Sequence, residues 1–278
     1  MMRLLVKGTI GSTSTMNVGY YAHNRTCTFP SSLNNSNYIA AWLKADANYM
    51  TLNGTSVVSW RDSFSNSSEN IISSGNGEQP IYNSQGMSGQ PTVYFDGEDD
   101  FLSGTTFADN IGQALNGHSG YTLFVAASPQ ASDENRVIFL LGASNNPKIQ
   151  PTLIPNGKFF VVTRPRDGTK KSSHNSNEAA TGSTVYIAKT NFENNSVNFY
   201  GNISGSKTDM GFEASSWNYT SSSDFKFTVG KHHQHTNTPK FFKGHIGEII
   251  LMKSALSDSN ITKVKDYLNC KYGLDLAY

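Results

Sequence analysis

FFKGHIGEIILMKSALSDSNITKVKDYLNCKYGL, residues 241–274, is the stretch that decides the fold of this chain. Its first half holds a nearly continuous apolar run, Ile246–Met252, which a single acid, Glu248, interrupts. A short apolar run of this kind is typical of a strand that is covered on both faces. We therefore expect a central strand over Phe242–Met252.

The second half of the same stretch predicts a helix. Ser257 and Asp258 are residue types that commonly begin helices, and Gly273 is a residue type that commonly ends them. Between them the apolar positions recur at helical spacing and make one face: Ile261, Val264 and Leu268, widened by Tyr267. The pattern predicts an amphipathic helix over Asp258–Lys271 that packs against the strand before it.

Length and composition narrow the class of protein. The chain has 278 residues, enough for a full core, and all-β folds of this length often form one domain. Charged residues make up 15% of it and the net charge is +1, so no basic footprint for nucleic acid or an anionic membrane is present. The start, MMRLLVKGTIGS, lacks the apolar core of a signal peptide, and no run is long enough to span a bilayer. The pattern indicates neither secretion nor membrane insertion.

Residues 1–37 differ from the rest of the chain. They are polar and rich in Gly, Ser, Thr and Asn, with scattered apolar residues such as Tyr20 and Phe29. We expect either a flexible leader or an arm that orders against a partner, followed by one domain over residues 38–278. The only cysteines, Cys27 and Cys270, lie near opposite ends; such a pair can bridge, but two cysteines do not make a disulfide framework. Free thiols are the expectation.

Short strand patterns separated by turn residues fill the middle of the chain. Turn signals stand at Asn53-Gly54, Asp96-Gly97 and Asn194-Asn195. Helical periodicity is nearly absent before residue 257, apart from a short turn at Phe107–Leu115. About ten strands and one terminal helix predict an antiparallel two-sheet sandwich. Strands are expected at 38–48, 55–63, 92–95, 121–128, 136–142, 158–164, 184–192, 196–202 and 225–231.

Five motifs occur in the order of a known family. They are AWLKAD (41–46), VVSWRDS (57–63), QPIYNSQGMSGQPTVYFDGEDDFL (79–102), YTLFVAAS (121–128) and the closing stretch 241–274. Together they resemble the concanavalin A-like, laminin G-like jelly-roll domains, over about residues 38–276. The resemblance implies an all-β jelly-roll sandwich with a short C-terminal helix. It says little about function, because this fold serves lectins, adhesion modules, glycanases and virion proteins.

Catalysis is not indicated by the residues. Glycan hydrolysis needs two carboxylates across the scissile bond, and glucanases of this sandwich class resemble one another in a Glu-x-Asp-x-Glu strand. Here Glu248 stands alone, because Ile250 and Met252 occupy the two following positions of that alternation. We interpret Glu248 as a buried carboxylate that ties loop backbone to the closing strand, and the protein as non-enzymatic.

Three groups of residues are candidates for binding, each with an alternative interpretation. Trp217 and Tyr219 lie in a polar stretch, where they either stack on a sugar or anchor the loop. Three histidines either offer imidazole ligands to a transition metal or lie in a solvated loop: His232, His233 and His235. Three carboxylates either bind calcium or simply belong to the turn pattern of the fold: Asp96, Asp99 and Asp100. No cofactor is specified.

Two functions are compatible with these observations. The preferred one is a bacteriophage virion protein, a head decoration or tail appendage made in the host cytoplasm. Its jelly roll would be displayed while residues 1–37 bind other virion proteins, in an oligomeric assembly, with host-surface glycans left open as a further partner. The alternative is a cell-surface or secreted carbohydrate-binding module. Neither involves nucleic acid or a membrane.

Overall fold

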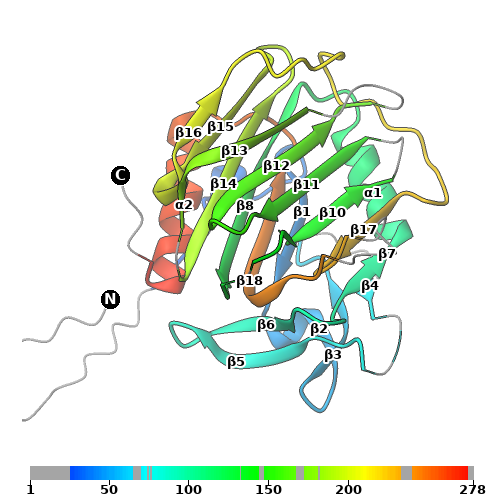
Figure 1. The fold of residues 1–278 in the computed structure, drawn as a ribbon, viewed down its shortest axis with the longest axis vertical. Helices are drawn as coiled ribbons and strands as arrows, with labels where there is room; N and C mark the ends of the chain where they lie inside the picture. Colours follow the sequence, from blue (N-terminus) through cyan, green and yellow to red (C-terminus); the bar gives the residue numbers. More distant parts are fainter. Residues whose placement is uncertain are drawn as a thin grey trace, which may run out of the picture.

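The fold is an antiparallel sandwich, as expected. The structure is a computed structural model that describes residues 26–64, 70–73, 75, 77–131, 133–143, 147–166, 172–180, 182–232 and 240–274. Two sheets face each other with one helix at an open end and another on an outer face (Figure 1). Within the described ranges, neither α-helix is long and apolar enough to cross a bilayer.

The first sheet is built around the apolar strand near the C-terminus. Its strands, in spatial order, are β1 (Ile39–Lys44), β18 (Lys243–Met252), β8 (Gly120–Pro129), β14 (Thr184–Asn191), β15 (Ser196–Tyr200) and β16 (Gly205–Lys207). In β18 every residue from Ile246 onward is buried, which confirms the expectation of a strand covered on both faces.

The second sheet carries the long middle of the chain. Its strands, in spatial order, are β4 (Asn70–Ile72), β7 (Leu102–Gly104), β17 (Lys226–Val229), β10 (Phe139–Gly142), β11 (Lys148–Leu153), β12 (Lys158–Arg164) and β13 (Ser172–Ala179), with β9 (Arg136–Val137) beside β11. Strands that join the two sheets are β2 (Met50–Asn53), β3 (Ser56–Arg61), β5 (Ile81–Met87) and β6 (Gln90–Asp96). Single 3-10 turns are η1 (Ser31–Leu33), η2 (Ala47–Tyr49) and η3 (Gly201–Ile203).

Alternation along the strands divides the apolar side chains between two cores. In β8, Leu123 and Val125 face the second sheet, whereas Phe124 and Ala126 face the opposite way. The first group belongs to the main core between the sheets. The second group belongs to a smaller core beneath α2 (Asp258–Tyr272).

Helix α2 forms as its sequence predicts. The Ser257 side chain accepts the backbone N–H of Asn260, and Gly273 ends the helix at a φ of 58°, where glycine is favoured. The buried residues of its apolar face include all four that the pattern named: Ile261, Val264, Tyr267 and Leu268. The expected helix is therefore confirmed, one residue longer than predicted.

The expectation of free thiols was wrong. Cys27 and Cys270 form a disulfide, with their Cα atoms 5.6 Å apart. The pair meets because the segment before β1 packs beside α2 and buries Phe29 and Leu33 in the smaller core. The free-thiol expectation relied on the absence of a disulfide framework, but a single pair can bridge where the fold brings its two cysteines together. Residues 26–37 of the expected arm thus lie on the module, residues 1–25 lie outside the described residues, and the division at residue 37 stays a prediction.

A second helix replaces the expected short turn. Helix α1 spans Thr105–Leu115 and closes one end of the main core. Its buried residues, Phe107, Ala108, Ile111 and Leu115, recur at helical spacing. The stretch was underestimated because Gly112 and Asn110 interrupt its apolar pattern. Gly112 is required there, since a Cβ at this position would lie 2.7 Å from the ring of Tyr219.

Candidate functional site

Glu248 lies at the centre of a closed polar cluster and is 0% exposed. Its Oε2 accepts the indole N–H of Trp42 at 2.8 Å. Its Oε1 accepts the Tyr267 hydroxyl at 2.8 Å and the Lys271 ammonium at 2.7 Å, with the Tyr272 hydroxyl at 3.5 Å. The prediction of a buried structural carboxylate is confirmed, but its partners are side chains of β1 and α2 rather than loop backbone.

The glycine before this acid lets the helix come close. A Cβ on Gly247 would lie 2.6 Å from the ring of Tyr272, and the pairing of β18 with β8 shifts register between Ile246 and Glu248. Two positions further along, Ile250 is buried in the smaller core. A second carboxylate is therefore missing from the strand at the position where a glucanase of this class carries one.

Two aromatic candidates are located in the interior, which corrects their expected role. Trp217 is 1% exposed and Tyr219 9% exposed, and both belong to the main core. The Tyr219 hydroxyl donates to Asp109 of α1, and its ring lies 4.6 Å from that of Phe225. A ring buried in this way has no free face for a sugar. The structure supports the alternative, in which both residues anchor their loop to the core.

The histidine candidates are only partly described. His232 is buried, at 5% exposed. His233 and His235 lie outside the described residues, so the metal hypothesis built on the three stays a prediction.

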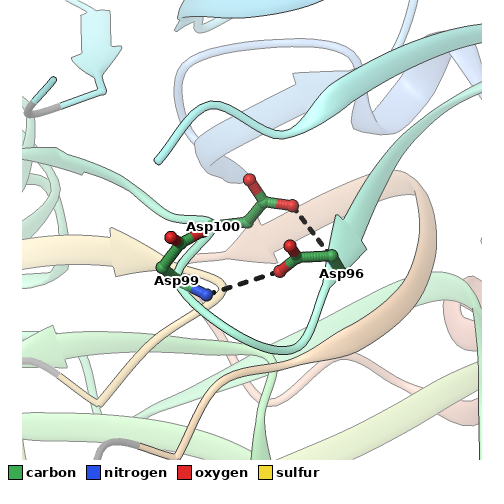
Figure 2. Close-up of side chains that lie close together, drawn as sticks. All are labelled: Asp96, Asp99 and Asp100. Carbon is green, nitrogen blue, oxygen red and sulfur yellow. Dashed lines mark hydrogen bonds between the residues drawn. The ribbon is translucent and has the colours of Figure 1, made fainter. Parts of the chain in front are cut away.

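The acidic candidates form a tight turn after β6 (Figure 2). The Asp96 carboxylate accepts the backbone N–H groups of Glu98 at 2.8 Å and Asp99 at 3.4 Å, and the Asp100 carboxylate accepts the N–H of Asp96 at 2.8 Å. Gly97 sits at the tip with a φ of 82°. The expected turn at Asp96-Gly97 is confirmed, and the turn's own backbone uses the carboxylates of Asp96 and Asp100.

Calcium fits this turn only in part. One oxygen atom from each of Asp96, Asp99 and Asp100 lies within 4.8 Å of the others, which provides three of the six to eight oxygen ligands that calcium takes. Burial is the main cause that raises the pKa of Asp100 to about 6, and the charges of Asp96 and Asp99 add to it. Hydrogen bonds within the turn account for the cluster, so we assign it no metal.

A cavity of about 340 Å³ opens at one end of the sandwich, where three connections between strands meet. These are the connection after β8, the turn between β11 and β12, and the turn between β13 and β14. Its lining residues are Pro129, Gln130, Ala131, Glu134, Arg136, Leu153, Ile154, Pro155, Asn156, Gly157, Ala180, Gly182 and Tyr186. A concave, mostly apolar site with few polar groups is the usual form of a small-ligand site.

Tyr186 is the unusual residue of this cavity. It is 0% exposed, and the centroid of its ring lies 5.0 Å from that of Phe159 in the main core, with the two rings tilted by 32°. Its hydroxyl is buried without a hydrogen-bond partner among the described residues. The hydroxyl of Thr184, two residues earlier on the same face of β14, also lacks one. Burial raises the pKa of Tyr186 well above its usual value, so its hydroxyl is neutral and offers both a donor and an acceptor.

Arg136 connects the cavity to the acidic turn. Its Nη1 donates to the backbone carbonyls of Gly97, at 3.2 Å, and Phe241, at 3.0 Å. The guanidinium therefore holds the loop before β18 and the Asp96–Asp100 turn at the wall of the cavity. Sequence analysis missed this site, because Tyr186 and Arg136 lie 50 positions apart in ordinary strand patterns. The one available signal was a tyrosine at an inward position of a buried strand, TVYIAKTN.

Comparisons with known proteins support the fold alone. No family model matches the chain, and no curated protein sequence matches it. Among solved structures, one of botulinum neurotoxin type C has a TM-score of 0.50 at 11% identity. Cell entry of that toxin depends on interaction with two ganglioside molecules. The match covers 86% of this chain and 52% of that one.

Two further solved structures are less similar. The CBM40 of the Ruminococcus gnavus IT-sialidase, bound to alpha2,3 sialyllactose, has a TM-score of 0.46 at 15% identity, covering 67% of this chain and 95% of that one. A Trypanosoma rangeli sialidase in complex with the inhibitor DANA has a TM-score of 0.45 at 11% identity, and the match covers 82% of this chain and 32% of that one. Similarity at these levels does not transfer a ligand or an activity.

Proposed function

We propose that this protein is a non-catalytic glycan-binding module whose site is the cavity at the end of the sandwich. The observation that carries the proposal is the cavity itself, whose mostly apolar walls also carry the polar side chains of Gln130 and Asn156. Such a lining suits a ligand that has both apolar and polar faces, as a sugar does.

The remaining lining suits a sugar. Apolar side chains such as Leu153 and Ala180 offer contact to the C–H faces of a sugar ring, and the amide side chains of Gln130 and Asn156 can bond its hydroxyl groups. Botulinum neurotoxin type C, which contains a similar sandwich, interacts with gangliosides, so glycan binding is compatible with this fold.

The disulfide favours a module that works outside the cytosol. Cys27 and Cys270 are paired, and such pairs persist in secreted proteins and at cell and virion surfaces, whereas the cytosol keeps thiols reduced. Between the two functions considered from the sequence, the cavity supports the surface or secreted carbohydrate-binding module, whereas the disulfide is compatible with both. Placement in a virion, binding through residues 1–37 and oligomeric assembly stay predictions.

The experiment is a glycan-array screen followed by titration calorimetry on the best binder. Wild type should bind, and Ala131→Trp should abolish binding, because Ala131 is an exposed lining residue and the larger side chain would fill the cavity. Ala47→Trp is the matched control, since Ala47 is also exposed but does not line the cavity. Failure of the wild type to bind any glycan, or equal binding by Ala131→Trp, would overturn the proposal.

A further inference from the structure

A second cavity lies beside helix α1, and we call it the helix cavity. Its volume is about 230 Å³, and its walls come from α1, the start of β1, the residues that follow β3, and Lys253 after β18. No residue lines both this cavity and the one at the end of the sandwich. The two cavities are therefore separate, and a ligand of the helix cavity would bind independently of a glycan.

The walls of the helix cavity are mostly apolar. Six of the lining residues are aliphatic or aromatic: Ile39, Ala40, Phe64, Phe107, Ile111 and Ala114. Three of them recur at positions i, i+4 and i+7 of α1 and so lie along one face of that helix. Phe64 is only partly buried, so it offers contact area to an apolar ligand.

Lys253 is the base of this cavity, and its ammonium has no partner. Among the described residues it makes no ion pair, side-chain hydrogen bond or cation–π contact. Burial lowers the pKa of Lys253, since its charged form has lost water without gaining a counter-charge. Lys44 is the other described lysine whose pKa burial lowers, but its ammonium lies 3.7 Å from the centre of the Trp42 ring.

The ammonium of Lys253 lies on the side of α1. Its backbone N–H donates to the carbonyl of Tyr38 at 2.7 Å, which fixes the residue beside the start of β1. Burial, and then the positive charge of Lys253, lower the pKa of His118, which follows α1 by three residues. The cation is therefore placed at the end of the apolar face of the helix.

Asp62 is the one acid among the described lining residues, and its carboxylate is already used. It is 5% exposed, and its Oδ1 accepts the backbone N–H groups of Trp42 at 2.9 Å and Phe64 at 3.0 Å. Within the described part of the chain, no ion pair joins it to Lys253. The charge that a ligand would find uncompensated is therefore the positive one.

We propose that the helix cavity is a second binding site, for a small monocarboxylate with an aromatic body. The carboxylate pairs with the Lys253 ammonium and offsets its desolvation, and the ring packs against Phe64, Phe107 and Ile111. The volume is below the roughly 300–1,000 Å³ that ligand sites usually span, so the body is limited to about one ring.

Benzoate is the probe, compared with the uncharged benzamide and the cationic benzylamine by ligand-observed NMR and calorimetry. We expect benzoate to bind about tenfold more tightly than benzamide, because its bond to the ammonium is charge-assisted, and benzylamine not to bind. Added salt should weaken the binding of benzoate and leave that of benzamide unchanged. No binding of benzoate, or equal binding of the three probes, would overturn the proposal.

The charge is tested by replacing the lysine. Lys253→Met keeps an apolar side chain of similar length and removes the ammonium, so benzoate should lose its tenfold advantage over benzamide. Lys263→Met is the matched control, since Lys263 is exposed on α2 and does not line the cavity. An advantage that survives in Lys253→Met would overturn the proposal.

A second pair of variants covers the case in which Lys253→Met changes the fold. Ser36 is exposed and lines the cavity, so Ser36→Trp should block it and abolish binding of benzoate. Ser31→Trp should leave binding unchanged, since Ser31 is exposed but is not a lining residue. Binding that is lost in Ala131→Trp, which fills the end cavity, but kept in Ser36→Trp would place benzoate in the end cavity and overturn the proposal.

Discussion

Two buried polar groups in this protein differ in one respect, the number of partners they have. Glu248, between β18 and α2, is 0% exposed and accepts hydrogen bonds from four side chains. Tyr186, on the opposite face of the same sheet, is equally buried, yet its hydroxyl has no partner among the described residues. By residue type alone, the acid was the natural candidate for chemistry and the tyrosine a core residue.

The comparison reverses that assignment. A buried group with all its partners stabilises the fold, while a buried group that lacks one leaves the cost of its desolvation uncompensated. The acidic turn lies between these cases, because its own backbone uses the carboxylates of Asp96 and Asp100, whereas Asp99 is exposed. Four predictions test this distinction.

The largest loss should follow removal of the satisfied acid. Glu248→Ala leaves Lys271 and two tyrosine hydroxyls without their acceptor, so we expect a loss of about 3–5 kcal/mol in the free energy of unfolding. Urea denaturation measures it, with the exposed Glu98→Ala as the control. A loss below about 1 kcal/mol would show that the cluster does not hold α2.

Breaking the disulfide should cost somewhat less. Cys27→Ser, Cys270→Ser and the double variant should each lose about 2–5 kcal/mol, because the unfolded chain is no longer constrained. The three should be equal, since each removes the same bond. Thermal melts with and without reductant provide the measurement. If reductant leaves the melting temperature of the wild type unchanged, the two cysteines are free thiols, as expected from the sequence.

The acidic turn should make stability depend on pH. The pKa of Asp100 is raised from 3.8 to about 6, chiefly by burial, so the folded state holds this proton more tightly than the unfolded state. Its stabilising contribution is therefore present below pH 3.8 and is lost as the pH rises through 6, by about 2–3 kcal/mol. Asp100→Asn should flatten this fall, and Glu98→Gln should not. An identical pH profile for Asp100→Asn would contradict the assignment.

The smallest effects separate the two buried tyrosines. Tyr121→Phe removes the 2.6 Å bond to Thr163 and should cost about 1 kcal/mol of stability. Tyr186→Phe removes a hydroxyl with no partner among the described residues, so its effect on stability should be neutral or slightly favourable. Chemical denaturation of both variants tests the order. If Tyr186→Phe is the more destabilised, its hydroxyl has a structural partner.

Much of the fold could be predicted, because burial leaves a pattern in the chain. The strand β18, the helix α2 and the turn at Gly97 follow from apolar runs, spacing and turn residues. Other strands were missed for physical reasons. Strand β13 reads SSHNSNEA, without apolar alternation, and β11 contains Pro151. Each is held by pairing with β12 rather than by its own pattern.

The candidate site could not be predicted in the same way. Its residues come from three connections that meet only in the folded chain, and the feature that identifies Tyr186 is a missing hydrogen bond. Trp217 misled for a related reason, since a tryptophan in a polar stretch marks an anchor as often as a binding surface. Sequence patterns report which residues are buried, but they do not report which buried groups lack partners.

The disulfide between Cys27 and Cys270 also determines how the module carries mechanical load. The two cysteines stand 243 positions apart and near the two ends of the described chain. Tension applied at those ends passes through the sulfur atoms and bypasses the strands between them. Tension that would separate the strands of a domain without this bond therefore leaves the sandwich and its end cavity intact. Force on a bound sugar would act only through the contacts of that sugar with the cavity.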